Sequence, residues 1–265
     1  MIPQQIPRGS VVKSTVRASL KDKYVSAVIA ALSPMFAFLT IYFLGSIWNV
    51  LFEGKFAFLS LVFFAVSAIF VVCPIVLGSV KYFWIVTEGG NPNPAEVFCY
   101  FGSFFRYKRA IKTTLLICFR LGATFFVCLL PYFIVMLLSN SWLYQFLGTE
   151  IPLWVTGLVV LESFLRIAGF AVALFLSLKD YLALAVIVMD DDMLLLEAFH
   201  ISAMVSRRSY ASFIGLVFSL LFWIIVSVFV VPIIYTAPLM LGCYAVHSRY
   251  ALVNYNMNLD YYSKE

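Results

Sequence analysis

Two segments of this chain share one pattern: EVFCYFGSFFRYKRAIKTTLLICFRLGATFFVCLLP (96–131) and EAFHISAMVSRRSYASFIGLVFSLLFWIIVSVFVVP (197–232). Each begins with a glutamate, passes through an aromatic amphipathic stretch to basic residues, and ends an apolar run at a proline. The markers are separated by the same 101 positions without a gap: Glu96 and Glu197, Arg106 and Arg207, Pro131 and Pro232. Such spacing of scarce residue types predicts an internal repeat with units of about 56–138 and 152–235. Convergence is the alternative, since helices that enter a membrane tend to carry basic residues at one end.

The composition is that of an integral membrane protein. Of the 265 residues, 63% are hydrophobic and 12% are charged, and the mean hydropathy is +1.00. Ordinary globular domains are about half apolar and a quarter charged, so a soluble fold could not bury this much apolar surface. Long uninterrupted apolar runs favour helices over a β-barrel, whose strands would alternate in short segments. The predicted fold class is therefore all-α, as a polytopic helical membrane protein.

Six transmembrane helices are expected. Their approximate bounds are Tyr24–Leu51, Phe56–Val86, Ile111–Leu138, 152–177, Tyr210–Tyr235 and Thr236–Val253. The second run is too long to cross a ~30 Å hydrocarbon core upright, and Pro74 with Gly78 predicts a kink in it. The six-helix domain covers 24–253, between a basic N-terminal segment, 1–23, and a short polar tail, 254–265. In the N-terminal segment, the four-residue spacing of Val12, Val16 and Leu20 predicts a short interfacial helix.

Orientation follows from the distribution of Lys and Arg between the two sides of the predicted bundle. One side carries the N-terminus, the C-terminus and two amphipathic segments, Ala95–Phe105 and Met193–Ser206; the other side carries Lys55 alone. This predicts that both termini are cytoplasmic and that the repeat is parallel, with two amphipathic helices at the cytoplasmic interface. The basic residues expected among the lipid headgroups are Lys81, Arg106, Lys108, Arg109, Lys112, Lys179, Arg207 and Arg208.

Three charges fall inside the apolar runs, namely Arg120, Glu162 and Arg166. Each costs about 2.5 kcal/mol or more in hydrocarbon unless it is paired or hydrated. Glu162 and Arg166 share one helix face, and their estimated depths place Arg120 close to both. The first interpretation is a structural cluster that holds the third span to the fourth. The second is a site for an anion or a lipid headgroup, because the three residues retain one net positive charge.

No catalytic or metal-binding motif is recognisable in the sequence. The five cysteines show no CxxC spacing, and neither His200 nor His247 has the neighbours that a metal or a nucleophile needs. The three aspartates at 190–192 could bind a divalent cation, but such runs more often end a helix in a solvated turn. Phosphate-binding loops, nucleophile elbows and zinc-protease helices are not found. We therefore expect a protein that is not an enzyme and that needs no cofactor or metal.

The chain resembles the six-span bacterial membrane proteins grouped as domain-of-unknown-function family 975. The likeness rests on VVKSTVRASLKDKY (11–24), GSVKYFWIV (78–86), LKDYLALAVIVMDDDMLLLEAFHISAMVSRR (178–208), and the last two spans with Pro232 and GCY (242–244). The resemblance implies a multi-pass protein of the bacterial cytoplasmic membrane and no particular activity. A fainter likeness to the membrane domains attached to glycerophosphodiester phosphodiesterases points to work on lipids.

Two functions are compatible with these observations. The first is a non-enzymatic membrane protein that binds membrane lipids, anionic ones included, or a membrane partner or second copy, through its interfacial amphipathic helices. The alternative is a transporter or channel subunit that uses Arg120, Glu162 and Arg166 as a polar path. The spans carry few other polar residues that could line such a path. Nothing in the sequence predicts a nucleic-acid partner.

Overall fold

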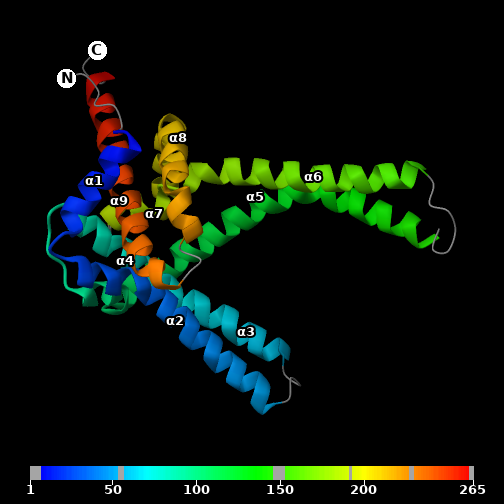
Figure 1. Cartoon of the computed structure of the whole chain (residues 1–265), viewed down its shortest axis with the longest axis horizontal. Helices are drawn as coiled ribbons and strands as arrows, with labels where there is room; N and C mark the ends of the chain where they lie inside the picture. The colour runs from blue at the N-terminus through cyan, green and yellow to red at the C-terminus, as the bar shows by residue number, and fades with distance from the viewer. Residues whose placement is uncertain (1–6, 53–56, 146–152, 191–192, 227–229, 263–265) are drawn as a thin grey trace. The chain divides into compact units, whose positions relative to one another are not determined.

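The computed structural model describes residues 7–52, 57–145, 153–190, 193–226 and 230–262, and every regular element in these ranges is a helix (Figure 1). The chain divides into two compact units. The first unit consists of residues 1–115 and 182–265, and the second consists of residues 116–181. The predicted all-α class is therefore confirmed.

The first unit holds most of the elements. They are α1 (Gly9–Leu20), α2 (Tyr24–Leu51), α3 (Ala57–Ser67), the π-helical turn η1 (Ala68–Val72), α4 (Cys73–Thr87), the 3-10 helix η2 (Pro94–Phe101), the start of α5 (Phe104–Gln145), α7 (Ala183–Met189), α8 (Leu195–Val226) and α9 (Val230–Tyr262). The second unit holds the rest of α5, α6 (Leu153–Ser177) and the 3-10 turn η3 (Leu178–Asp180). Helices α2 and α3 lie side by side as a hairpin that projects from the other helices of the first unit (Figure 1).

Four helical runs among the described residues are long and apolar enough to cross a membrane. They are Tyr24–Trp48, Phe58–Thr87, Phe104–Asn140 and Thr156–Met189, in agreement with the first four predicted spans. The chain is thus a multi-pass membrane protein. The last two spans were predicted to meet at Thr236, whereas α8 ends at Val226 and α9 begins at Val230. The proline at 232 falls in the first turn of α9, where a helix does not need its N–H, so the helix begins before the predicted boundary.

The buried face of α1 belongs to the core of the first unit. Val12, Val16 and Leu20 are all buried, as their four-residue spacing predicts for one helix face. They face the protein, however, and not the lipid: they join a core built from α2, α4, α8 and α9. A Cβ built on Gly242 of α9 would lie 2.5 Å from a methyl carbon of Val16, so only a glycine allows these helices to approach so closely.

Three prolines within helical runs, Pro34, Pro74 and Pro238, remove the N–H that the carbonyl four residues earlier would accept in an α-helix. A hydroxyl from another helix donates to each of these carbonyls: Ser79 to Ala30 O (2.8 Å), Tyr107 to Phe70 O (3.0 Å) and Tyr24 to Ile234 O (3.2 Å). The predicted kink near Pro74 takes the form of the π-helical turn η1, directly before α4. Each proline therefore also marks a place where two helices are joined.

The second unit is a helical hairpin. Phe125 and Phe170 stack with ring centroids 5.6 Å apart, and a Cβ built on Gly169 would lie 2.7 Å from the carbonyl oxygen of Cys128. Arg120 pairs with Asp180 and, further along α5, Ser139 pairs with the earlier residue Glu162, so the two helices pack antiparallel, with a small residue at the closest approach. The apolar side chains on the outside of this hairpin are largely exposed, as expected for a surface that faces lipid.

The two proposed repeat units differ in their local structure. In the first, η2 ends at Phe101 and a separate helix, α5, begins at Phe104, whereas the matching residues of the second unit lie in the single helix α8. Phe98 is 51% exposed while its counterpart Phe199 is 1% exposed. Pro131 lies inside α5, but Pro232 lies in the first turn of α9. The parallel repeat stays a prediction from the sequence.

Candidate functional site

The first unit exposes a group of phenylalanines beside basic residues, here called the aromatic-basic surface. Its members are Phe98 and Phe101 of η2 and Phe104, Phe105, Arg106, Lys108 and Lys112 of α5. All seven side chains are exposed, and Phe104 and Phe105 reach 80% and 68%. Aromatic rings and long cationic side chains at the end of a membrane-spanning helix are typical of the interface between hydrocarbon and headgroups. The exposed side of this segment therefore carries both aromatic and basic side chains.

The packing of η2 on α4 determines which of its side chains face outward. Val97 and Tyr100 are buried on the inner side of η2. A Cβ built on Gly78 of α4 would lie 1.8 Å from the carbonyl oxygen of Val97, so the backbone of η2 rests directly on α4. The ammonium group of Lys81 lies 5.8 Å from the centre of the Tyr100 ring. Phe98 is consequently left on the outer side.

Local hydrogen bonds fix both ends of this segment. The Asn93 side chain accepts from the backbone N–H of Ala95 (3.0 Å) and caps η2. The hydroxyl of Ser103 accepts from the backbone N–H of Arg106 (3.3 Å) at the start of α5. The Tyr107 hydroxyl donates to the carbonyl oxygen of Phe70 in η1 (3.0 Å). Its ring centroid lies 5.5 Å from that of Phe101. Both ends of the segment are therefore capped locally, and Tyr107 attaches it to the helix before α4.

The basic residues predicted to lie among headgroups fall into two groups. Five are exposed, namely Arg106, Lys108, Lys112, Arg207 and Arg208. The other three, Lys81, Arg109 and Lys179, are half-buried. Arg109 donates to the carbonyl oxygen of Asp190 at 2.7 Å, at the C-terminal end of α7. A cation there complements the partial negative charge of the helix end, so the role of Arg109 is structural.

The structure does not form the predicted cluster of Arg120, Glu162 and Arg166. Arg120 instead makes a bidentate pair with Asp180, with Nη2–Oδ1 and Nε–Oδ2 distances of 3.0 and 3.2 Å. Glu162 accepts a hydrogen bond from the Ser139 hydroxyl at 2.9 Å. Within the described part of the chain, no ion pair joins Glu162 to either arginine. Arg166 is exposed on the outside of α6.

The register of the α5–α6 hairpin explains this difference. The predicted depths count residues from the ends of the apolar runs, and Asp180 lies beyond the predicted fourth span, 152–177. In the structure Arg120 lies beside Asp180, which is 18 residues from Glu162 and thus about 27 Å away at 1.5 Å per residue. Depth estimates from the ends of two apolar runs carry no information on how the two helices are aligned. The sequence did not indicate Asp180 as the partner of Arg120.

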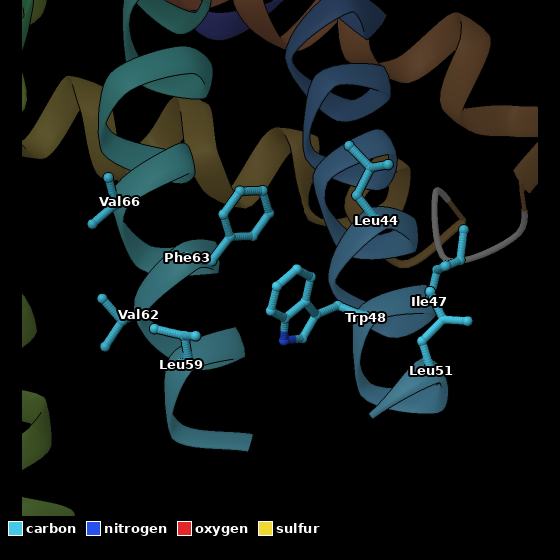
Figure 2. Close-up of a pocket in the computed structure, with 8 residues that line it drawn as sticks. All are labelled: Leu44, Ile47, Trp48, Leu51, Leu59, Val62, Phe63 and Val66. Atoms are coloured by element: carbon cyan, nitrogen blue, oxygen red, sulfur yellow. The ribbon is translucent and has the colours of Figure 1, made fainter. Parts of the chain in front are cut away.

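An apolar groove lies between α2 and α3. It has a volume of about 650 Å³ and is lined by apolar side chains, with Trp48 and Phe63 directed into the space between the two helices (Figure 2). The lining residues are Leu44, Ile47, Trp48, Leu51, Leu59, Val62, Phe63 and Val66. The groove runs along two membrane-spanning segments and has no charged group in its lining. It is therefore suited to binding hydrocarbon chains and not to catalysing a reaction.

A metal site is not found among the described residues, where no three His, Cys, Asp or Glu side chains converge. Asp191 and Asp192 of the aspartate run lie outside those residues. His200 is exposed, and the buried His247 has its Nε2 3.3 Å from the Ser212 hydroxyl. Neither histidine lies in an arrangement that indicates catalysis.

Comparison with known proteins does not assign the chain to a family. No protein-family model, curated protein or solved structure matches the chain. The resemblance to the family of six-span bacterial membrane proteins therefore stays a prediction. The function has to be argued from the exposed surfaces and charges of the chain itself.

Proposed function

We propose that this protein is a non-enzymatic membrane protein that binds anionic phospholipids at the aromatic-basic surface. The observation that carries this proposal is the exposure of four phenylalanines and three cations together at the start of a membrane-spanning run, Phe104–Asn140. Phenylalanine rings insert into the boundary between headgroups and acyl chains, and each nearby Lys or Arg adds about 1 kcal/mol of attraction to an anionic membrane surface.

The proposal includes the full topology. We place the protein in a bacterial cytoplasmic membrane, as a member of domain-of-unknown-function family 975, with four spans, a parallel repeat and both termini in the cytoplasm. Six spans would put Tyr24 and Tyr235 at opposite faces of the membrane, but their rings lie 6.3 Å apart and Tyr24 donates to the carbonyl oxygen of Ile234, so α8 and α9 stay on the cytoplasmic side. The asymmetric distribution of Lys and Arg supports this orientation, because basic residues are retained on the cytoplasmic side. A membrane-protein partner or a second copy is a further candidate for the same surface.

The topology predicts a labelling pattern. In a chain with Cys73, Cys118, Cys128 and Cys243 replaced by alanine, we expect Cys99 of η2 to react with a membrane-impermeant maleimide only after the bacterial cells are opened. The same chain with Cys99→Ala and Asn140→Cys, an exposed position near the outer end of α5, should react in intact cells. The chain without cysteine gives the background. Reaction of Cys99 in intact cells would contradict the orientation.

The lipid preference predicts the effect of removing charge from the surface. With bimane attached to Cys99, we expect brominated phosphatidylglycerol to quench the fluorescence at lower mole fraction than brominated phosphatidylcholine. The variant Arg106→Gln/Lys108→Gln should weaken this preference by about 30-fold, since two cations at about 1 kcal/mol each correspond to about 1.4 decades. The control variant Arg17→Gln/Lys21→Gln removes two cations at the C-terminal end of α1 and should leave the signal at Cys99 unchanged. Equal quenching by the two lipids in the unmodified sequence would refute the proposal.

The transporter or channel alternative has less support. The polar path that it requires would use Arg120 and Glu162, yet Arg120 is neutralised by Asp180 and Glu162 is bonded to Ser139. A residue that is already paired within a helical hairpin is a poor candidate for coordinating a passing solute. The geometry therefore favours lipid binding.

A further inference from the structure

A small hollow lies in the first unit between the end of α1, the start of α2 and α9. Its volume is about 160 Å³, and it is lined by Arg17, Leu20, Lys21, Tyr24, Tyr235 and Leu239. The two leucines are buried, whereas the two basic residues are exposed. The hollow therefore has apolar inner walls and a cationic rim, which is the polarity of a ligand with an anionic head and an apolar stem.

The hydrogen bonds of the neighbouring lysines show which cations are available at this rim. Lys13 donates to the carbonyl oxygen of Ser219 (3.0 Å), and Lys23 donates to that of Gly90. The side chains of Arg17 and Lys21, in contrast, form no hydrogen bond or ion pair with any residue that the structure describes. Arg17 lies in the last turn of α1 and Lys21 is its C-cap residue, four positions later, so their like charges repel unless an anion lies between them.

The aromatic residues place this hollow at the membrane interface. Tyr24 is the first residue of α2, the first helix that is long and apolar enough to span a membrane. The ring of Tyr235 lies 6.3 Å from the ring of Tyr24 and 5.3 Å from that of Trp223. Tyr and Trp gather at the level of lipid headgroups because their rings have an apolar body and a polar edge. The hydrogen bond from Tyr24 to the carbonyl oxygen of Ile234 holds this wall in position.

We propose that this hollow binds one phospholipid molecule that has an anionic headgroup. The phosphate lies between the guanidinium of Arg17 and the ammonium of Lys21, which can together donate several charge-assisted hydrogen bonds. The glycerol and the first acyl carbons contact Leu20, Leu239 and the tyrosine rings, and the rest of the chains extends into the bilayer. The inference rests on the membrane placement in the proposed function but not on the aromatic-basic surface.

The test uses the full chain, purified in a mild detergent and supplied with phosphatidylglycerol, with bound lipid counted by native mass spectrometry. We expect one tightly retained phosphatidylglycerol per chain. The variant Arg17→Gln/Lys21→Gln should require about 30-fold more lipid for half occupancy, because it removes two cations that each contribute about 1 kcal/mol. The exchanged pair Arg17→Lys/Lys21→Arg keeps both charges and should retain the lipid. These side chains point away from the buried face of α1, and an unchanged melting temperature in lipid-free detergent would verify that the variants fold.

The controls separate this site from the aromatic-basic surface. Arg106→Gln/Lys108→Gln removes the same charge and should keep the single retained lipid, while it loses the lipid preference reported at Cys99. Equal retention of phosphatidylcholine would overturn the assignment of an anionic headgroup. Displacement of the lipid by millimolar glycerol 3-phosphate would show that the site binds a soluble phosphate and not a lipid. Unchanged occupancy in Arg17→Gln/Lys21→Gln would exclude this hollow as the binding site.

Discussion

Replacing Gly78 by alanine is expected to lower the free energy of unfolding by about 3 kcal/mol, the upper end of the range for overpacked sites. The added Cβ would lie 1.8, 2.6 and 2.9 Å from the oxygen, carbon and Cα of Val97. These are backbone atoms, so no side-chain rotation can relieve the overlap, and η2 would have to move away from α4. The measurement is unfolding of the purified protein in detergent, followed by circular dichroism.

A second glycine gives a matched control for this prediction. Gly45 lies inside α2, in the part near its C-terminal end, and a Cβ built on it meets nothing within 4 Å. Gly45→Ala should therefore change stability by no more than about 1 kcal/mol, in the stabilising direction, because alanine has the higher helix propensity. If the two alanine variants were equally stable, the close contact between η2 and α4 would be absent. Gly78→Ala should also reduce lipid quenching at Cys99, since that reporter lies on η2.

Local sequence patterns predicted the parts of this fold that depend on one helix at a time. The four apolar runs predicted the four membrane-crossing helices, because length and hydropathy alone decide whether a helix can span a bilayer. The four-residue spacing of Val12, Val16 and Leu20 predicted one face of α1. The pattern could not say what that face would contact, since a lipid and a protein core are equally apolar.

Features that depend on the alignment of two helices could not be predicted. The contact of Gly78 with Val97, the hydroxyls that reach the carbonyls before Pro34 and Pro238, and the hollow beside Tyr235 all join segments far apart in the chain. Apolar periodicity defines a face but does not define which residue of the partner lies opposite. The aromatic-basic surface was predictable because all of its members lie close together in the sequence, between Phe98 and Lys112.

The pairing of Arg120 shows this limit most directly, and it leads to the second large expected effect. Asp180→Asn should lower the free energy of unfolding by about 2–3 kcal/mol. Removing one partner of a buried ion pair costs about 3–5 kcal/mol, and the value here is smaller because solvent reaches part of the arginine. The Asp180 side chain is 6% exposed and that of Arg120 is 31% exposed; asparagine could accept only one of the two hydrogen bonds and would leave the arginine charge without its carboxylate.

Two further variants decide between this pair and the cluster predicted from the sequence. Glu162→Gln should cost no more than about 1 kcal/mol, because glutamine can still accept the hydrogen bond from Ser139. Arg120→Leu/Asp180→Leu should recover most of the stability lost in Asp180→Asn, since it leaves no charge unpaired between the two helices. The predicted cluster requires the reverse order, with Glu162→Gln the more damaging change and Asp180→Asn nearly neutral. Melting temperatures of the four proteins in one detergent would establish which order holds, and with it the register of the α5–α6 hairpin.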